Sequence, residues 1–143
     1  MTIAGIAQLR AGHASIRVAP GSDCWIEGYR CVDCAAILPI RSMACRKCGS
    51  RTPLESFRAA ENGMVYSWTV VHRSYPGIAV PFVSAIVDLA DGLTLKGTLR
   101  IADLDAVRQG LPVRLVFDDA GGACDKDGVP YVGFHFVPEG ART

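Results

Sequence analysis

From residue 63 onward, short runs of apolar, β-branched and aromatic residues alternate with turn residues. There are five such runs: Met64–His72, Phe82–Leu89, Leu93–Arg100, Pro112–Phe117 and Tyr131–Val137. Runs of this length and composition are typical of antiparallel strands. Asp91-Gly92 supplies the positive φ that a tight hairpin needs. Ile101–Gln109 carries Leu104 and Val107 at helical spacing, which predicts a short helix or turn between the third and fourth strands.

The part of the chain before residue 63 has a different pattern. Ile3, Ile6 and Leu9 would share one face of a brief helix, so residues 1–22 are predicted to be a short helix or an extended lead. Cys24–Arg30 is predicted to be a strand that enters a cysteine-rich ribbon. The predicted domains are therefore an N-terminal lead over 1–22, a ribbon over 23–58 and a five-stranded OB-fold barrel over 59–143, with an SH3-like barrel as the nearest alternative to the OB fold.

The ribbon contains two Cys-x₂-Cys pairs separated by ten residues. The four cysteines are Cys31, Cys34, Cys45 and Cys48. Two such knuckles can complete a tetrahedron around Zn²⁺, and because the protein would fill all four positions the ion would be structural. A disulfide framework, a redox Cys-x-x-Cys and a rubredoxin-like iron site remain alternatives. Cys24 and Cys124 lie outside the pattern and are interpreted as bystander thiols.

Charge is segregated along the chain, although the net charge is only +1. Residues 30–58 carry six bases against two acids, a net charge of +4, whereas residues 82–143 carry nine acids against six bases, a net charge of −3. A basic surface attracts phosphates or an acidic protein face. Hydrophobic residues make up 50% of the chain, and an exposed part of this apolar surplus would mark a partner surface.

The usual signatures of an enzyme are missing from the sequence. There is no Gly-rich phosphate loop, no Gly-x-Ser-x-Gly elbow and no His-Glu-x-x-His. None of His13, His72 and His135 has a nucleophile or carboxylate partner nearby in the sequence. No signal peptide and no apolar run of about 20 residues is found. Four cysteines in a metal pattern favour a reducing compartment, so a cytoplasmic protein is expected. The missing catalytic signatures predict that it is not itself an enzyme.

The order of ribbon then barrel resembles a known family, the zinc-ribbon/OB-fold proteins called "domain of unknown function thirty-five". The motifs that carry the resemblance are Tyr-Arg-Cys-Val-Asp-Cys at 29–34, Pro-Ile-Arg at 39–41, Cys-Arg-Lys-Cys-Gly-Ser at 45–50, Gly-Met-Val-Tyr-Ser-Trp-Thr-Val-Val-His-Arg at 63–73, Pro-Phe-Val at 81–83 and Gly-Leu-Pro-Val at 110–113. The resemblance spans roughly residues 24–137. Ala35 stands where the family commonly has glycine, so some strain is expected in the first knuckle.

The resemblance implies a non-catalytic accessory subunit that binds and supports a thiolase-like acyltransferase, condensing enzyme or aldolase acting on acyl-CoA thioesters. It also implies a hetero-oligomer, with acyl-CoA at or near the shared interface. Candidate residues facing the partner or the CoA are Arg41, Arg46, Lys47, Arg51, His72 and Arg73. The alternative is a nucleic-acid-binding module, since ribbons and OB barrels also bind single strands. The acidic barrel disfavours this alternative because phosphates would be repelled.

Overall fold

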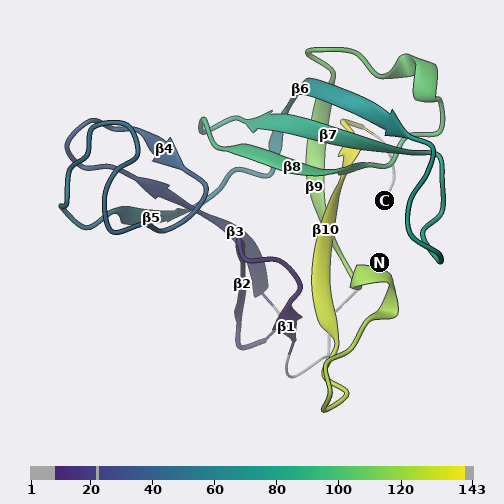
Figure 1. Ribbon diagram of the computed structural model, residues 1–143, viewed down its shortest axis with the longest axis horizontal. Helices are drawn as coiled ribbons and strands as arrows, with labels where there is room; N and C mark the ends of the chain where they lie inside the picture. The colour runs from purple at the N-terminus through teal and green to yellow at the C-terminus, as the bar shows by residue number, and fades with distance from the viewer. Residues whose placement is uncertain (1–8, 22, 141–143) are drawn as a thin grey trace.

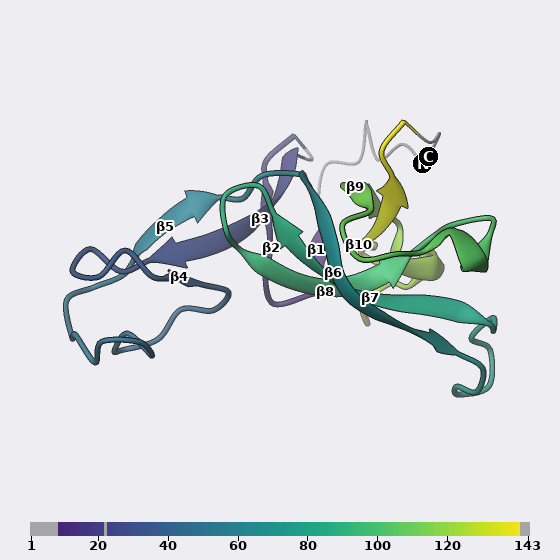
Figure 2. The same ribbon diagram turned by 90° about the horizontal axis from the view of Figure 1, so that it is seen from above.

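The computed structural model describes residues 9–21 and 23–140, which form two lobes along the long axis of the molecule. Figure 1 shows a small lobe built around β3, β4 and β5 on the left and a barrel on the right, and Figure 2 shows the same two lobes from above. Within the described ranges, no helix is long and apolar enough to cross a membrane.

The barrel contains the five strands that the sequence predicts. They are β6 (Asn62–Val71), β7 (Phe82–Leu89), β8 (Thr94–Leu99), β9 (Pro112–Asp118) and β10 (Tyr131–Pro138). Each strand pairs with the next in the order β6-β7-β8-β10-β9, and β9 returns to pair with β6. All of these pairings are antiparallel except β8 with β10, which is parallel. This closed five-stranded arrangement is that of an OB fold, so the predicted fold class is confirmed.

A short 3₁₀ helix, η1 (Leu104–Ala106), lies between β8 and β9, where the sequence predicts a helical piece. Asp103 caps it by accepting a hydrogen bond from the backbone N–H of Asp105. A second 3₁₀ turn, η2 (Ala120–Gly122), follows β9.

Alternation along the strands fills the barrel. On β7, Val83, Ala85, Val87 and Leu89 are buried, and the residues between them point outward. Phe136 on β10 is fully buried and meets Phe134 edge to face, with 6.0 Å between ring centroids. Gly97 on β8 makes room for both rings, because a Cβ atom there would lie 2.8 Å from Phe134 and 2.9 Å from Phe136. The barrel core is therefore closely packed around these aromatic rings.

The small lobe has its own antiparallel sheet. β3 (Asp23–Arg30) pairs with β4 (Ile37–Leu38) and β5 (Glu55–Arg58) through its C-terminal half. Its N-terminal half pairs with β2 (Ile16–Ala19). A two-residue strand, β1 (Arg10–Ala11), runs parallel to β10 at the foot of the barrel.

One strand, β3, takes part in both packings. Cys24 and Ile26 belong to the barrel core together with Ile16 of β2, whereas Tyr29 belongs to the core of the small lobe. Because β3 contributes to both cores, the predicted domain boundaries at 22/23 and 58/59 stay predictions. The described part of the lead forms β1 and β2 with a turn between them. Ile3 and Ile6, on which the alternative of a brief helix rested, lie outside the described residues.

Candidate metal centre

The four cysteines of the two knuckles come together at the far end of the small lobe. The Sγ atoms of Cys31, Cys34, Cys45 and Cys48 all lie within 4.8 Å of one another. The Sγ atoms of Cys31 and Cys48 are 3.7 Å apart, as are those of Cys34 and Cys45. A tetrahedral Zn²⁺ with bonds of about 2.3 Å to sulfur requires neighbouring sulfurs about 3.8 Å apart. The donor set and its spacing therefore fit a tetrahedral thiophilic ion, and all six cysteines that the structure describes are free of disulfide bonds.

The two knuckles share one local design. The N–H of Ala35 donates to the carbonyl of Cys31 at 2.8 Å, and the N–H of Gly49 donates to the carbonyl of Cys45 at 2.9 Å. The residue after each pair turns the chain with a positive φ, 63° at Ala35 and 76° at Gly49. Glycine adopts this conformation freely, whereas alanine adopts it at a cost. A hydrogen bond from the Ser50 hydroxyl to Asp33 joins the knuckles.

The strain at Ala35 leads to a direct prediction. Ala35→Gly is expected to stabilise the small lobe by about 1 kcal/mol, because the left-handed conformation then costs no clash with the Cβ atom. Chemical denaturation of the two proteins at equal metal content measures the difference. A glycine variant that is less stable than the parent chain would show that Ala35 is unstrained here.

Backbone N–H donors favour a thiolate at Cys45, one of the four candidate ligands. The N–H groups of Cys48 and Lys47 donate to the Cys45 sulfur and lower the pKa of this thiol to about 6. A thiolate at Cys45 is thus favoured near neutral pH. Although the backbone N–H of Ser50 lowers it, burial and the neighbouring cysteine sulfurs raise the pKa of Cys48 to about 12, and the pKa of Cys34 is raised as well. The four sulfurs therefore do not all ionise by themselves, and a bound cation would be needed to hold them as four thiolates.

The core of the small lobe is too small to stabilise it alone. Its buried apolar residues are Tyr29, Leu38 and Leu54, and the remaining buried members are Cys31 and Cys45. Domains with so little apolar core depend on metals or disulfides. The candidate metal ligands and the apolar residues of this lobe therefore belong to the same small core.

The predicted partner-facing residues fall into two separate groups. Arg41, Arg46, Lys47 and Arg51 are exposed on the small lobe. Arg41 and Arg51 line one shallow depression of about 460 Å³ with Met43, and the Arg41 guanidinium also lies 5.1 Å from the ring centre of Tyr29. His72 and Arg73 are exposed in the loop after β6, at the opposite end of the molecule in Figure 1. The six residues therefore do not form a single site.

The barrel contains a buried polar cluster that the sequence did not predict. The Nδ1 atom of His135 on β10 lies 2.6 Å from Oδ2 of Asp118 at the end of β9, and both side chains are buried. Asp118 also accepts a hydrogen bond from the N–H of Ala120, and Arg100 lies 4.0 Å away. Only the hairpin register brings these residues together, since 17 positions separate Asp118 and His135. The hydrogen bond joins the neighbouring strands β9 and β10.

A four-cysteine ribbon joined to an OB barrel defines a class of two-lobed zinc-ribbon/OB-fold proteins, and comparison with known proteins specifies the family. Residues 58–118 match the family model described as the ChsH2 C-terminal OB-fold domain. A DUF35 domain-containing scaffold protein of Methanocaldococcus jannaschii is 32% identical over 78% of this chain and 79% of its own length. This chain belongs to the DUF35 family.

Two further similarities concern proteins named as parts of enzyme assemblies. The benzoylsuccinyl-CoA thiolase subunit BbsA of Geobacter metallireducens is 27% identical over 78% of this chain and 73% of its own length. A chain in the solved structure called the Ltp2-ChsH2(DUF35) aldolase superposes with a TM-score of 0.64 at 29% identity. The match covers 80% of this chain and 84% of that one. The resemblance noted from the sequence is thus confirmed across both lobes.

Proposed function

We propose that this chain is a non-catalytic accessory subunit that binds and supports a thiolase-like acyltransferase, condensing enzyme or aldolase acting on acyl-CoA thioesters. The observation that carries the proposal is the similarity, over most of the chain, to a thiolase subunit and to a chain of an aldolase assembly. The matches span both lobes, so the proposal rests on the whole architecture rather than on the OB fold, which hosts many functions.

The chemistry of the described residues favours the role of a non-catalytic accessory subunit. The four thiols would fill the coordination sphere of a Zn²⁺ ion, which leaves no open position for a substrate or a water. The ion would hold the ribbon together and take no part in a reaction. The acyl transfer or carbon–carbon bond chemistry would therefore reside in the partner.

Affinity capture tests the proposal directly. The tagged chain, expressed in its native host, is expected to retain a thiolase-like protein through washing at physiological salt. Capture of a set of proteins without any CoA-dependent enzyme would contradict the proposal.

The basic face of the ribbon is proposed to meet an acidic partner surface or the phosphates of CoA. Reversing both charges in Arg46→Glu/Lys47→Glu is expected to weaken assembly by about tenfold, since charges at a rim govern association. The loss should shrink as salt is raised, and the zinc content should stay unchanged. Equal binding by the variant and the parent chain at low salt would exclude the basic face from the interface.

The alternative of a nucleic-acid-binding module is disfavoured by charge. The barrel that would hold the bases belongs to the acidic part of the chain, and β6, which carries the exposed Tyr66 and Trp68, contains no lysine or arginine. A salt-sensitive complex with a single-stranded oligonucleotide at micromolar concentration would reverse this ranking.

A further inference from the structure

Exposed apolar side chains are concentrated on one hairpin of the barrel. Seven of the ten large apolar side chains that the described chain leaves exposed lie between residues 64 and 86, on β6, β7 and the loop between them. They are Met64, Tyr66, Trp68, Tyr75, Ile78, Val80 and Ile86. Tyr75 at the loop tip is 80% exposed. Exposed apolar side chains concentrated in one segment are candidates for an interaction site.

The same segment is almost free of charge. Residues 63–87 contain a single charged side chain, Arg73, although charged residues make up 20% of the chain. Depletion of charge distinguishes the centre of a protein interface from ordinary surface. A second base, Arg100, lines the pocket described below together with Ile78 and Ala79 of the loop. A partner that covers this hairpin would thus meet apolar surface with positive charge at its margin.

The edge of β6 is open beyond its first residues. The N–H of Val65 donates to the carbonyl of Leu111, and its carbonyl accepts from the N–H of Gly110. After Val65 the strand has a bulge, and residues 67–71 pair with β7 only. Continuing the register across this bulge places the backbone polar groups of Trp68 and Val70 on the side away from β7. These groups are available to another strand.

This edge has a bulge after Val65 but no charged residue or proline that would protect it. Residues 64–71 contain no lysine, no acid and no proline. Natural proteins usually guard an exposed edge with these residues, because an unguarded edge recruits another chain. An open, uncharged and partly aromatic edge is therefore expected to be covered in the assembled state.

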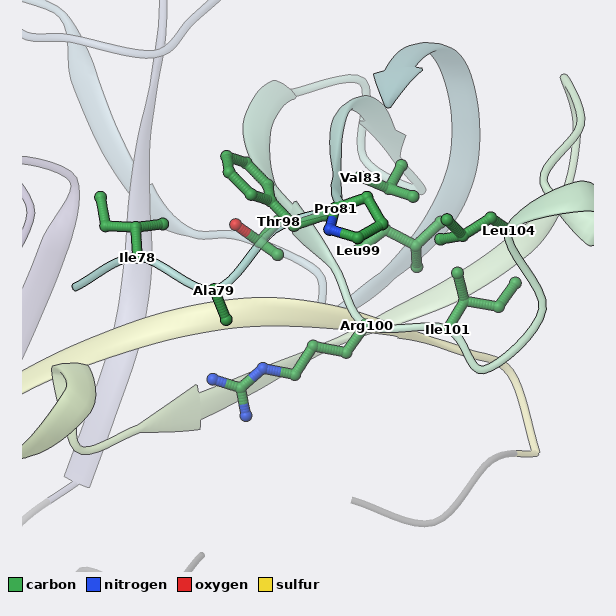
Figure 3. Close-up of a pocket in the computed structure, with 10 residues that line it drawn as sticks. Ile78, Ala79, Pro81, Val83, Thr98, Leu99, Arg100, Ile101 and Leu104 are labelled. Carbon is green, nitrogen blue, oxygen red and sulfur yellow. The ribbon is translucent and has the colours of Figure 1, made fainter. Parts of the chain in front are cut away.

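An apolar pocket lies at the base of the same loop. Its volume is about 560 Å³, and Figure 3 shows Ile78 and Ala79 of the loop on one side with Leu99, Ile101 and Leu104 on the other. Arg100 also lines the pocket, and its side chain extends away from Ile101 and Leu104 (Figure 3). A pocket of this kind suits an apolar anchor residue from a partner, with an acidic group next to Arg100.

We propose that the β6–β7 hairpin is the docking surface for the catalytic subunit, an inference that rests on the proposed function. The partner would add an extended segment to the β6 edge, place an apolar side chain in the pocket and bring acidic residues to Arg73 and Arg100. A second copy of this chain is a poorer occupant. A two-fold interface must be complementary to itself, yet residues 63–87 contain a base and no acid.

The test uses the thiolase-like subunit recovered by affinity capture and two hairpin variants. Trp68→Lys places a charge on the edge strand, and Tyr75→Asp places one on the exposed loop tip. Each is expected to weaken binding at least tenfold in calorimetry or interferometry. Ala123→Asp is the matched control, because Ala123 is exposed in the loop between β9 and β10, outside both the hairpin and the basic face of the ribbon. For charge, Arg73→Glu should weaken binding whereas Lys126→Glu on the β9–β10 loop should not.

Three outcomes would overturn the inference. Binding that survives Trp68→Lys and Tyr75→Asp unchanged would place the interface elsewhere and leave the proposed function intact. Light scattering that shows a homodimer of the parent chain, lost in Trp68→Lys, would assign the edge to a second copy. Failure to recover any thiolase-like protein with the parent chain would remove the proposed function and the inference together. Tyr75→Asp keeps the test decisive if Trp68→Lys fails to fold.

Discussion

Replacing Cys45 with serine is expected to abolish metal binding and unfold the small lobe. Cys45 is 3% exposed, receives two backbone N–H donors and lies 3.7 Å from the Cys34 sulfur, so a serine removes a ligand from the centre of the lobe. Structural Zn²⁺ contributes about 10–16 kcal/mol in zinc-finger peptides. The three apolar residues of this core cannot replace that contribution. Metal analysis is expected to fall from about one zinc per chain to near zero.

Cys124→Ser is the matched control for this change. Cys124 is exposed in the loop between β9 and β10, outside the four-cysteine cluster. Its replacement should leave zinc content and resistance to proteolysis unchanged. Fresh protein without chelator that holds well under half an equivalent of metal would contradict the assignment. Iron instead of zinc in that protein would retain the structural role and change the identity of the ion.

Phe136→Ala is expected to destabilise the barrel by about 3–5 kcal/mol. Phe136 is fully buried, packs edge to face on Phe134 and fills the space that Gly97 leaves open. The cavity left by the ring cannot collapse easily, because it lies between the paired strands β8 and β10. A domain is typically stable by only about 5–15 kcal/mol, so the variant should be marginally folded.

Urea denaturation measures this loss, and Met43→Ala serves as the control. Met43 is 93% exposed on the small lobe, and its truncation should change the free energy of unfolding by less than about 0.5 kcal/mol. A Phe136→Ala protein with the denaturation midpoint of the parent chain would show that this ring does not hold the barrel together.

The strands of the barrel were predictable because their pattern is local. Each run of β-branched and aromatic residues became a strand with bounds within two residues of those expected, as Phe82–Leu89 of β7 and Tyr131–Pro138 of β10 illustrate. Turn residues such as Gly92, with a φ of 95°, define where the strands end. Local propensity and tertiary structure agree here.

The cysteine cluster was predictable for a similar reason. Two residues between thiols dictate a knuckle, and the structure adds only the distances between the sulfurs. The strain at Ala35 could be anticipated because the residue after a knuckle needs a positive φ.

Features that depend on pairing between distant residues were not predictable. His135 and Asp118 meet because β9 and β10 pair with Gly133 opposite Asp118, a register that no short motif encodes. The pairing of β2 with β3 and the role of Ile16 in the barrel core likewise depend on tertiary contacts. The open edge of β6 arises because β9 pairs with this strand only as far as Met64, and no local motif indicates where that pairing ends.

We propose that this chain supports catalysis by another subunit and performs none itself. The measurement is turnover of an acyl-CoA substrate by the chain alone, by the captured thiolase-like subunit alone and by both together. The account predicts no turnover by the chain alone. It predicts a rate for the pair at least about tenfold above that of the catalytic subunit alone, which corresponds to an activation barrier lowered by about 1.4 kcal/mol. Turnover of acyl-CoA by the purified chain without a partner would contradict the account.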